Sequence, residues 1–306
     1  MAPGRESPFT LVALLVLSAL SGACGVGDVA TPSTQHADGP APPSADGASG
    51  GARRTCSEPA EDRPAGSACV SSVEGSLVED GSNSPLSLFV SICGGVCFAG
   101  SSDAGAFRVP IGRFVDLSTY VLHVDGRPEH TDRFVRLPRS SSDALVLAEP
   151  VQVPRLDQRG PTLPESPVAS PSVLRAGDVT LTLAPNTAIA VAFTDVARGA
   201  EGRLLRSGRV SAEVSRDPNL LALHALAPFG ATLVPEAEIA IVLPPSPVVA
   251  DGTTLDLVAL DEDLLSAEVG TLRVVGTATV HDGVARSDAG HGIGKLTWIG
   301  VRKSSR

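Results

Sequence analysis

The sequence of 306 residues predicts an all-β fold, with two β-sandwich domains behind a disordered, lipid-anchored N-terminal tether. First, apolar and polar residues alternate along short runs, for example over Val179 to Leu183 (VTLTL), as in a strand with one buried face. Second, turn sequences such as Asp125-Gly126 separate the runs at intervals typical of a sandwich. Third, the runs show no helical period.

The composition excludes several functional classes. The chain carries 24 Lys and Arg residues against 34 Asp and Glu residues, a formal net charge of −10. Only Lys295 and Lys303 are lysines, which argues against nucleic-acid binding, because that needs clustered basic side chains. A second long apolar run is missing from the sequence, so a polytopic membrane protein is not expected. No motif calls for a cofactor.

The N-terminus predicts export, with residues 1–23 as a signal peptide. The apolar run Phe9 to Leu20 is too short to span a bilayer as a helix, and small residues follow it. The segment LSGAC, ending at Cys24, resembles the lipobox of bacterial lipoproteins, although Ser21 stands where that pattern has Leu. The resemblance implies acylation of Cys24, with Gly25 favouring the outer membrane. The alternative is an ordinary signal peptide cleaved near the same site.

Residues 24–66 are expected to form a disordered tether. This segment is rich in Gly, Ala, Pro, Ser and Asp, and it lacks the apolar surface needed to offset its ordering entropy. The segment GASGG at Gly47 to Gly51 matches a serine-hydrolase pattern, but a nucleophile elbow needs a strand before it and a helix after it.

The four remaining cysteines predict two disulfides in an exported chain. Three connectivities are possible, and we favour Cys56–Cys69 and Cys93–Cys97. Two glycines between Cys93 and Cys97 allow the reversal that such a short bridge requires. A four-thiolate zinc site is the alternative, but the spacing lacks paired CxxC knuckles, and no metal is expected. A redox role for Cys93 and Cys97 is also disfavoured, because thioredoxin-like chemistry uses CxxC.

Residues 67–153 are predicted to form the first sandwich. Candidate strands cover residues 73–78, 86–92, 106–111, 120–124 and 133–137. The order of motifs, namely Val73-Glu74-Gly75, Pro85-Leu86, then Ser102 to Phe107 (SDAGAF), resembles the carboxypeptidase regulatory-like (transthyretin-like) domain. This resemblance implies a non-catalytic sandwich that stabilises, spaces or helps to bind in secreted and surface proteins.

Prolines punctuate residues 154–172, which predicts a semi-rigid polyproline spacer and a domain boundary. Residues 173–302 are predicted to form the second sandwich, followed by a tail at 303–306. Strand patterns recur at 179–183, 236–241, 253–260 and 295–301, and Trp298 is expected to anchor the core or a sheet face. Segments including Gly177 to Pro185 (GDVTLTLAP) are similar to β-rich surface proteins and lipoproteins of Gram-negative bacteria, particularly myxobacteria. A looser similarity is to the sandwich shared by ankyrins and netrin receptors, without the His-Phe-Ser step at which some relatives cleave themselves.

Other motifs carry weaker hypotheses. A hairpin could bring His281 and His291 near Asp282 and Asp288 for metal binding, but polar turns explain these residues equally well. The acidic turn at residues 261–263 lacks a calcium-loop pattern, and the glycine-rich segment 290–295 lacks the Walker spacing.

Together these patterns predict a non-enzymatic lipoprotein of the outer membrane, on its periplasmic or cell-surface face. Its expected role is structural, adhesive or protein-binding, with the membrane contacted through the lipid and a possible envelope protein as partner. A free sheet edge could bind that partner. One alternative is an accessory module that presents or modulates a secreted hydrolase, and another is a hydrolase with an unrecognised site.

Overall fold

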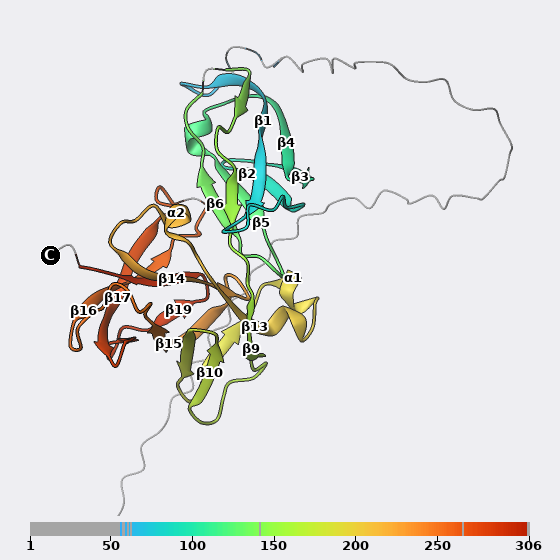
Figure 1. The fold of residues 1–306 in the computed structure, drawn as a ribbon. Helices are drawn as coiled ribbons and strands as arrows, with labels where there is room; N and C mark the ends of the chain where they lie inside the picture. The colour runs from blue at the N-terminus through green and yellow to red at the C-terminus, as the bar shows by residue number, and fades with distance from the viewer. Residues whose placement is uncertain are drawn as a thin grey trace, which may run out of the picture. The chain divides into compact units, whose positions relative to one another are not determined.

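Two β-sheets form the framework of the computed structural model, which describes residues 56, 59, 61, 63–140, 142–264 and 266–304 (Figure 1). The all-β prediction is confirmed. The helices η2 (Leu117–Thr119), α1 (Phe193–Val196), η3 (Glu201–Arg203) and α2 (Ala212–Ser215) are single turns. The signal peptide, Cys24 and nearly all of the predicted tether lie outside the described residues.

The first sheet has eight strands in the order β6-β5-β2-β3-β4-β1-β7, with β8 also paired to β1. We call its residues, 68–153, the first module. Its strands are β1 (Ala68–Glu79), β2 (Phe89–Cys93), β3 (Cys97–Asp103), β4 (Ala106–Val115), β5 (Val121–Asp125), β6 (Arg133–Arg136), β7 (Ala144–Val146) and β8 (Val151–Val153).

The second sheet has twelve strands in the order β10-β11-β15-β18-β17-β16-β20-β14-β13-β9, with β12 and β19 also paired to β15. We call residues 158–302 the second module. Its strands are β9 (Gln158–Thr162), β10 (Ser172–Ala176), β11 (Val179–Leu183), β12 (Ala188–Ala190), β13 (Leu204–Arg209), β14 (Leu220–Ala227), β15 (Thr232–Val242), β16 (Thr254–Leu260), β17 (Leu272–His281), β18 (Val284–Ser287), β19 (Ile293–Lys295) and β20 (Trp298–Arg302).

Turn chemistry places two of the hairpins where the sequence indicates them. Ala104 and Gly105 have φ values of 46° and 86° between β3 and β4, and Asp282 and Gly283 have values of 51° and 71° between β17 and β18. Positive φ at both central residues matches the twist of the flanking strands, so these short turns fix the register of each hairpin.

The predicted spacer over residues 154–172 is not supported by the structure. Strand β9 lies within it and pairs with β13 of the second module. Just before β9, the carbonyl of Pro154 accepts a hydrogen bond from the Thr131 amide of the first module. Both ends of this segment are therefore tied to sheets by backbone hydrogen bonds. Proline spacing alone does not reveal the partner strands that supply them.

Three hydrophobic clusters form the core of the described part of the chain. One lies inside each module, and the third joins them, because Val121 and Phe134 of the first module pack with Phe229 and Trp298 of the second. The rings of Phe134 and Phe229 lie 6.0 Å apart. The two modules are therefore in direct contact and belong to one compact unit.

Two disulfides join Cys56 to Cys69 and Cys93 to Cys97, which are the pairings that the sequence favoured. Cys93 ends β2 and Cys97 begins β3, so this bridge closes the hairpin between these strands. The other bridge ties the segment before β1 to the second residue of that strand. No helix in the described part of the chain has the length and apolarity that a membrane crossing requires.

Candidate functional site: a cleft between the two modules

The segment Thr131 to Arg133 is the centre of the contact between the modules, and its three side chains make three different interactions. Thr131 Oγ1 accepts a hydrogen bond of 2.9 Å from Nε1 of Trp298. Asp132 lies 3.0 Å from Nε2 of His123, and the guanidinium of Arg133 lies 4.9 Å from the centre of the Trp298 ring. This short segment therefore contacts both the edge and the face of the Trp298 indole. Trp298 lies 167 residues from Thr131 in the sequence.

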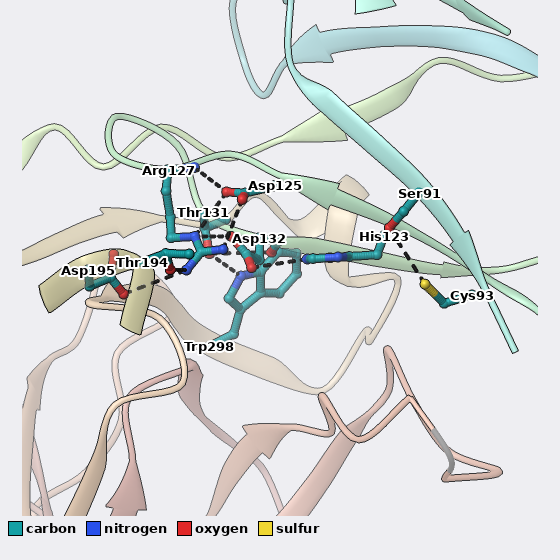
Figure 2. A network of polar contacts seen from close by, with 10 residues as sticks. All are labelled: Ser91, Cys93, His123, Asp125, Arg127, Thr131, Asp132, Thr194, Asp195 and Trp298. Carbon is teal, nitrogen blue, oxygen red and sulfur yellow. Dashed lines mark hydrogen bonds and ion pairs between the residues drawn. The ribbon is translucent and has the colours of Figure 1, made fainter. Parts of the chain in front are cut away.

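Arg127 forms a polar link between the modules (Figure 2). Its guanidinium donates to both carboxylate oxygens of Asp125 at 2.9 and 2.8 Å, and it also donates to Thr194 Oγ1 at 3.0 Å. Asp132 and Asp195 lie 3.7 and 3.6 Å from it. We call these residues the Arg127 network. One cation thus serves carboxylates from both modules.

Burial and the charge of Arg127 together shift the pKa values of Asp125 and Asp195 in opposite directions. Burial raises the pKa of Asp125, but the hydrogen bonds and charge of Arg127 outweigh it, so that the net pKa is lowered. For Asp195, burial dominates over the attraction of Arg127, and its pKa is raised. Hydrogen bonding to Asp125 raises the pKa of Arg127, which stays protonated. The network is therefore held together by a permanent cation.

A cleft of about 750 Å³ opens beside this contact. We call it the inter-module cleft. All four residues of β6, the segment 147–152, residues 213–216 in and after α2, and Gly270 line it. A smaller pocket of about 180 Å³ shares Ser215 and Gly270 with the cleft and is lined in part by Trp298. The hollow thus adjoins the indole that links the two modules.

Arg133 gives the cleft its distinctive chemistry. Among the described residues, the hydrogen-bond partner of its guanidinium is the carbonyl of Val214, 3.3 Å from Nη2, and its Nε is buried without a partner. No carboxylate of the described chain lies within ion-pair distance of it. Burial and the nearby charge of Arg216 lower its pKa to about 10, against a smaller opposite effect of the Asp80 carboxylate, so it remains a cation at neutral pH. Its buried positive charge is therefore only partly compensated by the protein.

The other charged groups of the cleft lie at its surface. Arg216 pairs with Glu149 at 2.5 Å, with both side chains 76% exposed, and the Arg136 guanidinium donates to the carbonyl of Ala267. The Ser215 hydroxyl donates to the backbone carbonyl of Ala212 at 3.1 Å. The charged groups of the cleft can hold an anion. The Ser215 hydroxyl, by contrast, already donates its hydrogen to a backbone carbonyl.

The histidine and aspartate residues considered for metal binding fasten a loop. Asp288 accepts hydrogen bonds from the hydroxyls of Thr277 and Thr279 at 2.5 and 2.7 Å, which lower its pKa. His291 Nδ1 lies 2.8 Å from the same Thr277 hydroxyl. The amide of Asp282 instead donates to Asp251. Within the described chain, no three His, Cys, Asp or Glu side chains are grouped to hold a metal ion.

The other two motifs also have structural roles. In the acidic turn, Asp261 accepts a hydrogen bond of 2.7 Å from the Ser266 hydroxyl, and Glu262 pairs with Lys295 at 2.6 Å. Lys295 ends the glycine-rich segment and belongs to β19, so this segment joins strands rather than a strand and a helix.

The sequence did not single out Arg133, Arg216 or the role of Trp298 in the module contact. The run Thr131-Asp132-Arg133 at the start of a candidate strand was the available signal. It was uninformative by itself, because nothing in local spacing pairs it with residues of the second module.

Comparisons with known proteins add little. No family model matches the chain, and no curated protein matches it. One solved structure, of a Bacteroides uniformis protein proposed to bind carbohydrate, is 11% identical and covers 76% of this chain and 98% of that chain, with a TM-score of 0.21. A likeness at this level carries no functional argument. The resemblance to carboxypeptidase regulatory-like domains stays a prediction.

Proposed function

We propose that this protein is an exported lipoprotein of the outer membrane that acts without catalysis, as a binding protein of the cell envelope. The inter-module cleft is its binding surface. The observation that carries the proposal is the partly buried guanidinium of Arg133, which lines a cleft of about 750 Å³ and has no carboxylate partner in the described chain. A binding partner that brings an anion would complete this interaction.

The construction of the cleft supports a binding role. Its walls come from both modules, and the Arg127 network and the Trp298 contact hold these walls together. A preformed cleft loses little conformational entropy when it is occupied, which favours affinity. Its Ser215 hydroxyl donates to a backbone carbonyl, whereas a catalytic nucleophile would donate to a base.

The N-terminal sequence and the disulfides support export. The run Phe9 to Leu20 precedes Cys24, and both disulfides are of the kind that persists in oxidising compartments. We expect the Cys24→Ala variant to lose metabolic labelling by a palmitate analogue and to move from the membrane fraction to the soluble fraction. The Cys93→Ala/Cys97→Ala variant, which retains Cys24, is the control. Unchanged labelling and membrane attachment of Cys24→Ala would contradict the anchor.

Site-specific photo-crosslinking tests the binding surface. A photoreactive side chain in place of Ala148, exposed in the cleft, is expected to give one defined adduct with an envelope protein. The matched control is Val248, which is 89% exposed and lies outside the cleft. Equal adducts from both positions, or none from Ala148, would count against the proposal. If the captured protein is a hydrolase whose turnover changes on binding, the accessory role applies instead.

A further inference from the structure

The Arg133 guanidinium has two faces with different surroundings. One face lies 4.9 Å from the centre of the Trp298 ring, and Nη2 donates to the Val214 carbonyl. The same side chain lines the inter-module cleft. A guanidinium carries five N–H donors, and apart from the 3.3 Å bond to Val214 the described residues supply no hydrogen-bond acceptor for them, with Nε itself buried. The free donors match a carboxylate, which can accept two parallel hydrogen bonds.

The charge around Arg133 strengthens this preference. Arg136 and Arg216 also line the cleft, against Glu149 and Glu213, so the lining is net positive in a chain of formal net charge −10. Arg216 is itself paired with Glu149. A local positive site on an acidic protein attracts an anionic group, whereas the acidic remainder of the surface repels it, which gives specificity of position.

The walls of the cleft favour a peptide over a sugar. Leu147 and Pro150 contribute aliphatic surface. The aromatic rings nearby are covered, since Phe134 is 6% exposed and Trp298 is 1% exposed. Stacking of a sugar ring needs an exposed aromatic face, whereas aliphatic side chains of a peptide pack against aliphatic walls.

We propose that the inter-module cleft binds an acidic peptide segment of a protein partner, with one of its carboxylates paired to Arg133. This inference rests on the proposed function, because it names the class of ligand for the same surface. The carboxylate completes the coordination of a partly buried cation, and the apolar side chains beside it cover the aliphatic walls.

Strand addition to β6 is not the mode of binding. Strand β6 is the end strand of the first sheet, but Gly270 covers part of its free edge. A Cβ at Gly270 would lie 2.8 Å from the Phe134 carbonyl oxygen, so the two backbones are in close contact there. Recognition therefore depends on side chains that line the cleft, and above all on Arg133.

Trp298 provides a direct reporter, because it is the only tryptophan in the chain and it contacts Arg133. The probe is a capped octapeptide of alternating valine and glutamate, and its counterpart has glutamine in place of glutamate. Using the mature lipidated chain in detergent, we expect only the glutamate peptide to change the Trp298 emission saturably. Affinity is expected to fall with added salt, because the pairing is ionic.

Variants identify the residue that binds. Arg133→Gln is expected to weaken binding of a dye-labelled glutamate peptide, measured by anisotropy, at least tenfold. Arg133→Lys keeps the charge but lacks the planar guanidinium, so its affinity for the peptide is expected to lie between that of Arg133→Gln and that of the unaltered chain. Arg159→Gln, on an exposed residue of β9 outside the cleft, should bind as the unaltered chain does. Arg216→Gln reports on the cleft without altering the Trp298 contact, and we expect a loss of a few-fold. Thermal melts verify that each variant folds.

The results separate this inference from the proposed function. Equal binding of the glutamate and glutamine peptides, or unchanged binding by folded Arg133→Gln, overturns the acidic-peptide inference. Tighter binding of an oligogalacturonate or of inorganic phosphate than of the peptide also overturns it, in favour of another anion source. Failure of the Ala148 crosslink, by contrast, overturns the proposed function itself.

Discussion

At the scale of single residues, the buried side chain of His224 makes the stability of the fold depend on pH. It is 2% exposed, and its Nε2 is without a hydrogen-bond partner in the described structure. Burial lowers its pKa to about 4, from 6.5. The unfolded chain therefore binds a proton at this residue before the folded chain does, and the folded state loses stability as the pH falls from about 6.5 to about 4.

We expect His224→Gln to remove this part of the acid sensitivity. The two pKa values imply that, at pH 4, the unaltered protein loses about 3 kcal/mol of unfolding free energy relative to the variant. Urea unfolding at pH 7 and at pH 4 measures the difference. Parallel pH profiles for the two proteins would show that His224 does not titrate in this way.

At the scale of elements, the turn that contains Gly270 fixes β6 against the second module. Gly270 has φ of 78°, and a Cβ there would lie 2.8 Å from the Phe134 carbonyl oxygen. An alanine would face both backbone strain and this close approach, with a cost of about 1–3 kcal/mol. We expect Gly270→Ala to lower the melting temperature and to change the Trp298 emission.

Gly283 separates the cost of backbone strain from the cost of the close approach to Phe134. It has φ of 71° in the turn between β17 and β18, and a Cβ added there would meet no other atom within 4 Å. Gly283→Ala therefore measures the cost of backbone strain without the clash, about 1 kcal/mol, and should leave the Trp298 emission unchanged. If the two variants lose equal stability, the contact with Phe134 has no energetic weight.

At the scale of the whole molecule, the Arg127 network is one of the contacts that join the modules, beside the hydrophobic cluster around Trp298. Arg127→Gln would leave Asp125, Asp132 and Asp195 close together without their common cation. Breaking a buried ion pair in this way typically costs about 3–5 kcal/mol. We expect a loss of this order in unfolding free energy at pH 7, and a contact between modules that opens first, visible as faster amide exchange at Trp298 and its neighbours.

The pH dependence of this variant has a defined sign. Arg127 lowers the pKa of Asp125, so its contribution to stability is present above the unfolded pKa of 3.8 and is lost as the pH falls through the lowered value. Protonation of carboxylates also relieves the repulsion in Arg127→Gln. The difference between the two proteins should therefore shrink as the pH falls below about 3.8, and a constant difference across that range would refute the ionic explanation.

The sequence by itself determined the all-β class, several strand positions and the short turns. Residues 179–183 were predicted as a strand and form β11, and residues 133–137 were predicted and form β6 as Arg133–Arg136. These features depend on alternation and turn residues, which are local. The favoured cystine pairings could also be found locally, because Cys93 and Cys97 are separated by only three residues.

Tertiary structure alone decided that residues 154–172 join the two sheets and that a cleft forms between the modules. Strand β9 depends on β13 for its hydrogen bonds, and the Trp298 contact brings together residues 167 positions apart. The same holds for Arg133, whose environment comes from α2, β20 and the chain after β7. Such pairings arise when separate apolar surfaces are buried together, and no spacing rule along the chain encodes which surfaces meet.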